Sequence, residues 1–290
     1  MLSAYFIHLA IITTIFVILV VSLNVSLGYT GLLNLGHIAF YGIGAYATAI
    51  LTKQGYHFLF AMFIGAVVAG FSTWFLTIIT SRLKGDYFAL GTLGFSFVVY
   101  VLFLNWTGLT RGPLGIAGIP KPHIFGLIIR TNVSYLVFVL FVAIIVCGLL
   151  YLIVSSRYGK LLEAVRDNAL GASRLGKNIF KLKYQAMIIS AFVASIAGSL
   201  YAHYISFIDP STFYLNDIII VLTMVIVGGL ASFRGSIVAT IIIMLLPELL
   251  RFVNLPSSMI GPMRQIMYAV LLLLILHFRP RGLFGRVDLQ

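Results

Sequence analysis

The N-terminal stretch of the chain, residues 1–52, reads MLSAYFIHLAIITTIFVILVVSLNVSLGYTGLLNLGHIAFYGIGAYATAILT and holds no Asp, Glu, Lys or Arg. As a single helix, the 52 residues before Lys53 would be about 78 Å long, more than twice the hydrocarbon thickness of a bilayer. The stretch therefore predicts two membrane passes. We expect the turn between them at residues 27–31, where two glycines favour a change of direction.

The composition of the whole chain also indicates that most of its surface contacts lipid. Of its 290 residues, 61% are apolar and 9% are charged, against about 25% charged in an average soluble domain. This excludes a soluble enzyme and a disordered segment, and the single Cys147 excludes an intrachain disulfide. The apolar N-terminus is not typical of a signal peptide, because it lacks a basic leader and its apolar run is too long.

Further uncharged runs predict the remaining passes. Residues 54–81, 87–110, 131–156 and 184–208 are each long enough to span, whereas 218–233, 235–247 and 265–278 are at or below the usual length. We therefore expect short, tilted or re-entrant helices in the C-terminal third. The sequence predicts an all-α polytopic membrane protein with about nine transmembrane helices, within a range of eight to ten, forming one domain over residues 1–290.

The net charge of +12 would suggest nucleic-acid binding in a soluble protein, but here it predicts orientation. Nine passes place the 19 Lys and Arg residues unevenly. The richer side holds Arg82, Lys84, Arg157, Lys160, Arg166, Arg174, Lys177, Lys181, Lys183, Arg234, Arg279, Arg281 and Arg286, and the other holds Lys53, Arg111, Lys121, Arg130, Arg251 and Arg264. The richer side is expected to be cytoplasmic, which places the C-terminus inside and the N-terminus outside.

One long hydrophilic loop, residues 156–183, interrupts the apolar pattern. Within it Leu161, Val165, Ala169 and Ala172 recur at the spacing of one helix face, which predicts a short amphipathic helix. Three interpretations remain open on composition alone: a basic helix on anionic lipid, a solvated loop, or a helix that docks into a groove of a cytosolic protein.

The same loop contains a near match to a phosphate-binding motif. Residues 171–178, GASRLGKN, differ by one residue from G-x-x-x-x-G-K-[ST]. Asn178 stands where a hydroxyl must bind Mg²⁺, and no strand precedes Gly171. We therefore expect no nucleotide site and no cofactor in this chain, so that ATP and Mg²⁺, where used, are bound by other subunits.

A few polar residues within the apolar runs are candidates for a substrate pathway. Asn34 and His37 are three residues apart, so we expect them on one face of the second helix, where hydrogen bonding between helices is the alternative role. Thr92 and Ser96 are weaker candidates in the fourth pass. The glycines around Asn34 favour a broken helix whose free backbone groups face a cavity.

The motifs that are missing narrow the mechanism. No carboxylate lies deep in the first six passes, whereas an ion-coupled secondary transporter usually has one there. There is no HExxH, no GxSxG and no voltage-sensor-like arginine series, which argues against an intramembrane enzyme and a voltage-gated channel. A transporter is the best interpretation, and a membrane subunit that only mediates interactions is the remaining alternative.

Four stretches, in order along the chain, resemble one known family. They are 31–50 (GLLNLGHIAFYGIGAYATAI), 82–95 (RLKGDYFALGTLGF), 105–120 (NWTGLTRGPLGIAGIP) and 158–183 (YGKLLEAVRDNALGASRLGKNIFKLK). Together they are similar to the permease subunits of bacterial ABC importers for branched-chain amino acids, of the LivM type. Permeases for urea and short amides are related to this family.

The resemblance implies a non-enzymatic permease of the inner membrane that works with two cytosolic ATPase subunits, a second related permease or a copy of itself, and a periplasmic substrate-binding protein. It also implies that residues 156–183 form the cytoplasmic coupling loop, with Arg157, Glu163, Arg166, Asp167 and Arg174 at the ATPase interface. A secondary transporter driven by an ion gradient and an ABC permease for urea or short amides remain alternatives.

Overall fold

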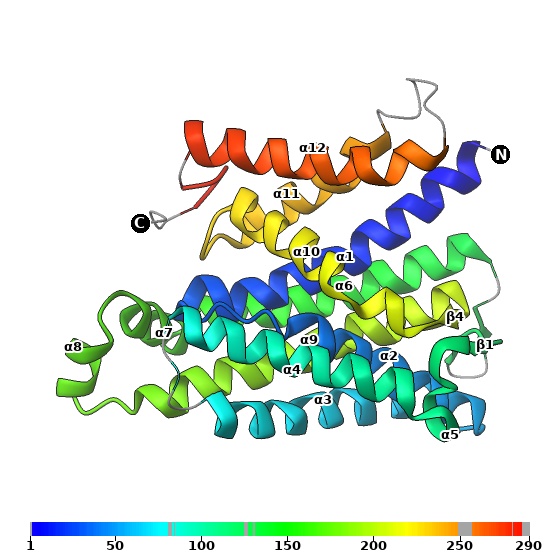
Figure 1. Ribbon diagram of the computed structural model, residues 1–290, viewed down its shortest axis with the longest axis horizontal. Coiled ribbons are helices and arrows are strands. Elements are labelled where there is room, and N and C mark those ends of the chain that lie inside the picture. Colours follow the sequence, from blue (N-terminus) through cyan, green and yellow to red (C-terminus); the bar gives the residue numbers. More distant parts are fainter. Residues whose placement is uncertain are drawn as a thin grey trace.

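The computed structural model of the chain is a bundle of long, roughly antiparallel helices (Figure 1). It describes residues 2–80, 83, 85–124, 127–129, 131–248, 257–279 and 281–285, so Arg82, Lys84, Arg130, Arg251 and Arg286 lie outside the described part. The helices that build the bundle are α1 (Leu2–Thr30), α2 (His37–Lys53), α3 (Phe58–Thr80), α4 (Asp86–Asn105), α6 (Asn132–Ser155), α9 (Ile179–Ile205), α10 (Leu215–Gly228), α11 (Phe233–Leu245) and α12 (Ser257–Phe278).

Short elements lie at the two ends of the bundle. One end, called here the α8 end, carries α7 (Arg157–Asp167) and α8 (Ala169–Arg174). The other, called the β1 end, carries α5 (Thr107–Thr110), η1 (Gly112–Leu114), β1 (Ile116–Ala117), β2 (His123–Ile124), β3 (Leu127–Ile128), β4 (Phe207–Ile208) and η2 (Pro210–Phe213). β1 pairs antiparallel with β4, and β2 pairs antiparallel with β3.

The predicted all-α polytopic fold is confirmed. Seven segments of the described residues are long and apolar enough to cross a membrane, starting at Ala4, Phe58, Asp86, Asn132, Ile179, Pro210 and Gly261. α2 has 17 residues and α11 has 13, which corresponds to about 26 Å and about 20 Å of helix. Together with α10, these two shorter helices bring the helices of 13 or more residues in the described part of the chain to nine, of which α11 is shorter than a full membrane crossing.

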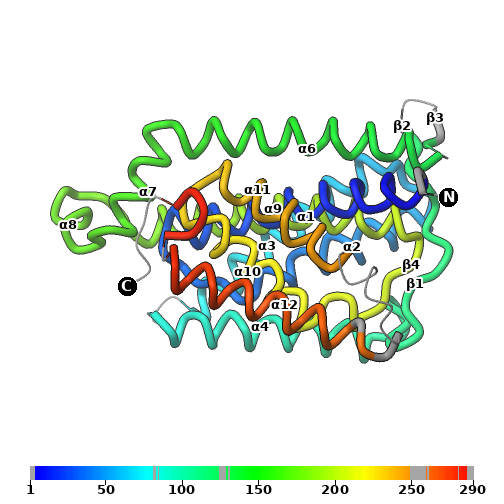
Figure 2. The backbone as a smooth tube through the Cα atoms, turned by 90° about the horizontal axis from the view of Figure 1, so that it is seen from above, coloured from blue at the N-terminus to red at the C-terminus, as the bar shows by residue number. Residues whose placement is uncertain are grey.

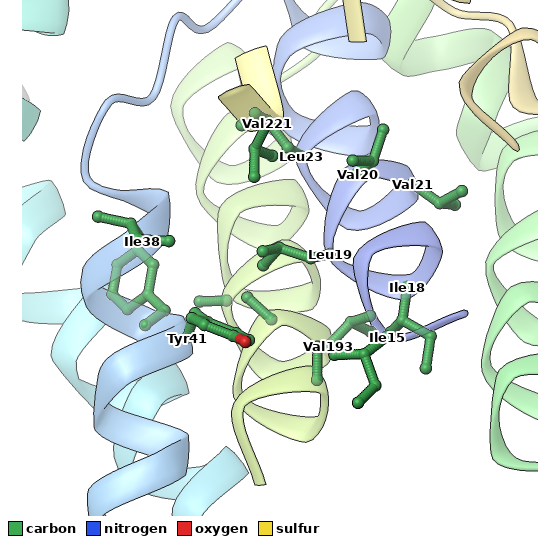
Figure 3. Close-up of a cluster of buried hydrophobic side chains, with 14 of the residues drawn as sticks. Ile15, Ile18, Leu19, Val20, Val21, Leu23, Ile38, Tyr41, Val193 and Val221 are labelled. Atoms are coloured by element: carbon green, nitrogen blue, oxygen red, sulfur yellow. The ribbon is translucent and has the colours of Figure 1, made fainter. Parts of the chain in front are cut away.

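α9 lies at the centre of the bundle and is packed against α1, α2 and α3. Small residues allow this: a side chain at Gly198 would collide with the backbone carbonyl of Tyr41, and one at Gly44 would collide with Ser195. Figure 3 shows the apolar side of the same contact, where Leu19 of α1, Tyr41 of α2 and Val193 of α9 face one another.

The break between the first two passes falls a little later than predicted. α1 continues through Gly28 to Thr30, and the chain then leaves the helix at Gly31, whose φ of 71° favours glycine. Residues 31–34 are not helical, and α2 begins at His37. The prediction that Asn34 and His37 share a face of one helix is therefore wrong, because Asn34 precedes the helix.

Candidate coupling site and substrate pathway

α7 and α8 replace the single amphipathic helix that the sequence predicts. Ser156 begins α7 by accepting a hydrogen bond from the backbone N–H of Tyr158, and Asn168 begins α8 by accepting one from Gly171. Asn168 has φ −149° and ψ 86°, which is not a helical conformation, so the chain is interrupted between α7 and α8 at this residue. The prediction of one continuous helix is wrong because the Asn168 side chain competes for a backbone amide that the helix would use.

The buried face of the pair also differs from the predicted stripe. Leu162, Val165 and Ala172 are buried, whereas Leu161 and Ala169 are only half-buried. The turn from α6 into α7 requires glycine, since a Cβ at Gly159 would collide with the carbonyl of Val154. α7 therefore packs against the ends of α1, α6 and α9.

α8 presents an exposed apolar tip. Leu170 and Leu175 are 76% and 80% exposed, and the side chains of Arg174 and Lys177 beside them are also exposed. We call Leu170, Arg174 and Leu175 the α8 knob. Two large exposed apolar side chains beside cations, on a helix that projects from the bundle (Figure 2), are typical of a protein contact surface.

Arg166 has a different environment from the other predicted coupling residues. Its Nη1 donates to the carbonyl oxygen of Gly28 at 2.7 Å, and its Nε lies 2.8 Å from Oδ1 of Asp167. Only 12% of the Arg166 side chain is exposed, against 62% for Asp167. Arg166 thus caps a free carbonyl in the last turn of α1 and joins α7 to that helix. Arg157 and Arg174 are exposed, and Glu163 is half-buried.

Asn24 makes a second connection at the same end of α1, and the sequence analysis missed it. Its Nδ2 donates to Ser232 O at 3.1 Å and to Ser236 Oγ at 2.6 Å, and its Oδ1 accepts from Ala231 N–H at 3.1 Å. Ala231 and Ser232 belong to the turn between α10 and α11, and Ser236 lies in the first turn of α11. The signal was available, because Asn24 is the single Asn or Gln among residues 2–30 of the first predicted pass.

Three of the four predicted pathway residues meet around the unwound segment after α1. The Leu35 N–H donates to Thr92 Oγ1 at 3.0 Å, and Ser96 Oγ donates to Leu35 O at 3.3 Å. Asn34 Oδ1 accepts from Gly36 N–H at 3.0 Å, while its buried Nδ2 has no hydrogen-bond partner among the described residues. Asn34, Thr92 and Ser96 therefore surround a short stretch of non-helical backbone, at a site where α4 replaces the missing helical hydrogen bonds.

His37 faces away from this group. Its Nε2 lies 2.9 Å from Ser22 Oγ and 3.2 Å from Leu19 O, and its Nδ1 lies 3.4 Å from Ser190 Oγ. The ring is fully buried between α1 and α9. These contacts fit the alternative role of hydrogen bonding between helices.

The β1 end holds a second buried histidine. His203 is fully buried, with Nε2 at 3.1 Å from Thr52 Oγ1 and Nδ1 at 2.8 Å from Ser199 O. Nearby, Asp209 accepts hydrogen bonds from Ser211 and Thr212. Partial burial would raise the pKa of Asp209, but these hydrogen bonds outweigh it and lower the pKa.

Comparisons with known proteins agree with a polytopic membrane fold. The family model described as "Branched-chain amino acid transport system / permease component" matches residues 5–276. The chain is 34% identical to the high-affinity branched-chain amino acid transport system permease protein LivM of Escherichia coli K12, over 98% of this chain and 71% of the relative. It is 26% identical to a probable LivM of Methanocaldococcus jannaschii, over 93% and 90% of the two chains.

A more distant relative is the autoinducer 2 import system permease protein LsrC of Yersinia pestis, at 25% identity over 69% of this chain and 55% of the relative. No solved structure matches the chain. The family model covers nearly the whole chain, the LivM relatives are matched over most of their length, and the described residues hold seven spanning segments. The chain is therefore a multi-pass membrane protein that belongs to the family of branched-chain amino acid transport permeases, and it serves as a permease subunit of an ABC importer.

Proposed function

We propose that this permease moves leucine, isoleucine and valine across the bacterial inner membrane, and that separate ATPase subunits hydrolyse the ATP that drives transport. The observation that carries the substrate assignment is the 34% identity to a LivM protein over 98% of the chain. ATP and Mg²⁺ bind to the ATPases and not to this chain. Its aliphatic cargo carries only an ammonium and a carboxylate, which backbone groups of an unwound helix can bind.

The α8 end is proposed to face the cytoplasm. The described basic residues concentrate there, in α7, in α8 and at the adjoining ends of α9, α11 and α12, as the positive-inside rule requires. Residues 281–285 and α8 both lie at this end (Figure 1). The β1 end then faces the periplasm and receives the substrate-binding protein, while a second permease, related or identical, completes the pathway.

The α8 knob is proposed to fit a groove in the ATPase, with Arg157, Glu163, Asp167 and Arg174 setting its register around Leu170 and Leu175. Arg166 acts differently, as a positioning residue. Its hydrogen bond to Gly28 passes a displacement of α7 to the end of α1, and Asn24, one turn earlier, passes it on to the α10–α11 turn. Closure of the ATPases would then move α1 together with α10 and α11.

The substrate pathway is proposed to pass the unwound segment beside α4, where Asn34, Thr92 and Ser96 meet. The buried Asn34 Nδ2, which has no hydrogen-bond partner among the described residues, supports this, because a buried amide donor without an acceptor is costly. A substrate carboxylate would satisfy it. His37 contributes by holding the start of α2 against α1 and α9.

Reconstitution tests the proposal. The permease, its ATPases and its second permease are placed in proteoliposomes with ATP inside and the binding protein outside, and uptake of labelled leucine, valine, urea and acetamide is measured. We expect uptake of leucine and valine only when ATP and the binding protein are both present. Accumulation by the purified chain under a proton or sodium gradient would refute the ABC mechanism, and uptake of urea in place of leucine would refute the substrate.

The coupling site is tested in the same vesicles with Leu175→Asp, which places a charge in the centre of the α8 knob. We expect uptake and transport-stimulated ATP hydrolysis to fall at least about tenfold while the amount of folded permease stays the same. The matched control is Phe278→Asp, since Phe278 at the end of α12 is 74% exposed and lies outside the α8 knob. Equal loss of ATPase stimulation in both variants would show that the knob has no special role.

A further inference from the structure

A charged pocket lies between α7, the end of α6 and the α10–α11 turn, and the transport steps above place no ligand in it. Its volume is about 490 Å³, within the range of small-molecule sites. Lys160, Glu163 and Arg234 contribute charge to its wall, and Tyr151, Phe233 and Phe284 contribute aromatic surface. Figure 2 shows that the parts of the chain that carry these residues meet at the α8 end.

The three charges share the pocket without neutralising one another. Within the described residues, Lys160, Glu163 and Arg234 make no ion pair or side-chain hydrogen bond with one another or with other groups. Glu163 is half-buried, where an unpaired carboxylate is more costly than at the open surface. The wall therefore presents one anionic and two cationic groups to whatever enters, which suits a ligand carrying both an ammonium and an anionic group.

The aromatic part of the wall suits an apolar side chain on the same ligand. The rings of Tyr151 and Phe233 meet edge to face, with centroids 5.7 Å apart, and Phe284 lines the pocket with them. By contrast, a cavity of about 460 Å³ between α1, α6 and α11 has an almost entirely apolar wall, including Leu9, Leu140 and Ile241. The residues that line this second cavity carry no charge, so it provides no partner for the ammonium and carboxylate of an amino acid.

We propose that the charged pocket binds a free aliphatic α-amino acid from the cytoplasm and that its occupancy slows import. Glu163 binds the ammonium, Arg234 and Lys160 bind the carboxylate, and the aromatic side chains contact the aliphatic group. The cytoplasmic location and the effect on import rest on the proposed function.

The pocket lies between two parts of the coupling path, and this explains how a bound ligand would slow import. Lys160 and Glu163 belong to α7, whereas Phe233 and Arg234 follow the turn that Asn24 binds. A ligand that bridges the two sides ties α7 to the α10–α11 turn. Arg166 and Asn24 transmit a displacement of α7 to this turn only through α1, so α7 and the turn move by different amounts. A ligand that fixes the spacing between them resists this movement, so that imported amino acid limits its own uptake.

Direct binding tests the site. The full chain is placed in nanodiscs of phosphatidylcholine and phosphatidylglycerol, without binding protein, and saturable binding of labelled leucine is measured. Leucinamide, which lacks the carboxylate, and 4-methylpentanoate, which lacks the ammonium, serve as competitors. We expect Glu163→Gln to weaken leucine binding about tenfold or more but to leave 4-methylpentanoate within about twofold. We expect Arg234→Gln to weaken leucine and 4-methylpentanoate more than leucinamide.

The matched control is Lys177→Gln, an exposed cation after α8 that does not line the pocket. It should bind all three compounds like the unmodified chain. No saturable leucine binding, or equal binding by all variants, would overturn the proposal. Phosphatidylethanolamine carries the same pair of charges, so it is added in a second set of nanodiscs. If Glu163→Gln and Arg234→Gln alter retention of that lipid while leucine does not bind, the site holds a lipid headgroup and the proposal fails.

Transport provides the second readout. Proteoliposomes are loaded with ATP and increasing leucine, and the initial rate of binding-protein-dependent uptake is measured. We expect internal leucine to slow uptake severalfold in the unmodified transporter and to have no effect in Arg234→Gln, each compared with its own rate without internal leucine. Absence of any ATP-dependent uptake would contradict the proposed function and leave the nanodisc result to decide the site. Normal uptake that ignores internal leucine would contradict the inference alone.

Discussion

α9 and α12 are two long apolar helices with opposite places in the molecule. α9 has 27 residues and α12 has 22, and both have a window apolar enough to cross a membrane. In α9, 78% of that window is buried within the chain, whereas in α12 none of it is. Figure 2 shows α9 inside the bundle and α12 along its side.

The difference lies in side-chain size and not in hydrophobicity. The buried residues of α9 include Ala194, Ser195, Gly198 and Ser199, while α12 carries a run of leucines at 271–274. Lipid solvates leucine as well as a protein interior does, so large apolar side chains gain little from burial in a membrane. Small residues let backbones approach closely and let hydroxyl groups reach neighbouring carbonyls, and they select which helices lie inside.

The largest effect is expected from filling the closest contact of α9. Gly198→Leu would place side-chain atoms against the backbone of Tyr41 and Ala45, which cannot move without separating α2 from α9. We expect loss of most of the folded protein, measured as the monodisperse fraction after detergent extraction. The matched control is Gly148→Leu in α6, where a Cβ meets nothing within 4 Å. Similar losses in both variants would show that helix propensity, and not close packing, is responsible.

A smaller but clear effect is expected from Asn24, a polar residue among the apolar side chains of α1. Asn24→Leu removes three hydrogen bonds and leaves the Ala231 N–H and the Ser232 carbonyl buried without this partner. We expect a loss of about 1–3 kcal/mol in stability, visible as a lower Tm in a thermal scan. Asn105→Leu is the control, because Asn105 is exposed and its amide donates only to Val101 within its own helix. An equal fall in Tm would argue against a special role for the α1–turn contact.

Arg166 is expected to affect coupling more than stability. Arg166→Met keeps much of the apolar stem but removes the hydrogen bond to Gly28 and the ion pair with Asp167. We expect Tm to fall by a few degrees at most, because the ion pair is largely exposed on the Asp167 side, while leucine transported per ATP hydrolysed falls severalfold. Asp167→Asn removes the ion pair but keeps the Gly28 contact, so it should lower coupling less than Arg166→Met does. Equal uncoupling by both variants would assign the effect to charge at the interface and not to the link with α1.

The polytopic helical fold follows from the sequence because lipid requires an uncharged run of sufficient length for each pass. The first residues of α7 and α8 could also have been predicted, since Ser156 and Asn168 are favoured residues at helix N-termini. The regular spacing of apolar residues from Leu161 to Ala172 favoured one continuous helix and so concealed the break at Asn168. Local chemistry at Asn168 outweighed the periodic pattern.

The rotation of each helix about its own axis could not be predicted from the sequence. This rotation decides which side chains meet at the candidate site. Asn34 and His37 point to different neighbours because α2 begins at His37, and the contacts of Arg166 with Gly28 or of Asn24 with Ser236 join residues more than a hundred positions apart. Apolar content does not specify which face of a helix meets protein and which meets lipid. Small residues carry that information, but only once a partner helix is known.

The smallest effect is expected on the exposed face of α12. Leu273 is 67% exposed, so Leu273→Ala in the isolated permease leaves no cavity and exchanges one lipid contact for another. We expect Tm to change by less than about 1 °C, against several degrees for Leu200→Ala, whose side chain is fully buried in α9. The measurement is then repeated on the assembled transporter. If Leu273→Ala still has no effect there, α12 faces lipid in the complex. If it weakens assembly, a helix of another subunit packs against α12, and the large side chains of α12 are then buried between subunits and not within one.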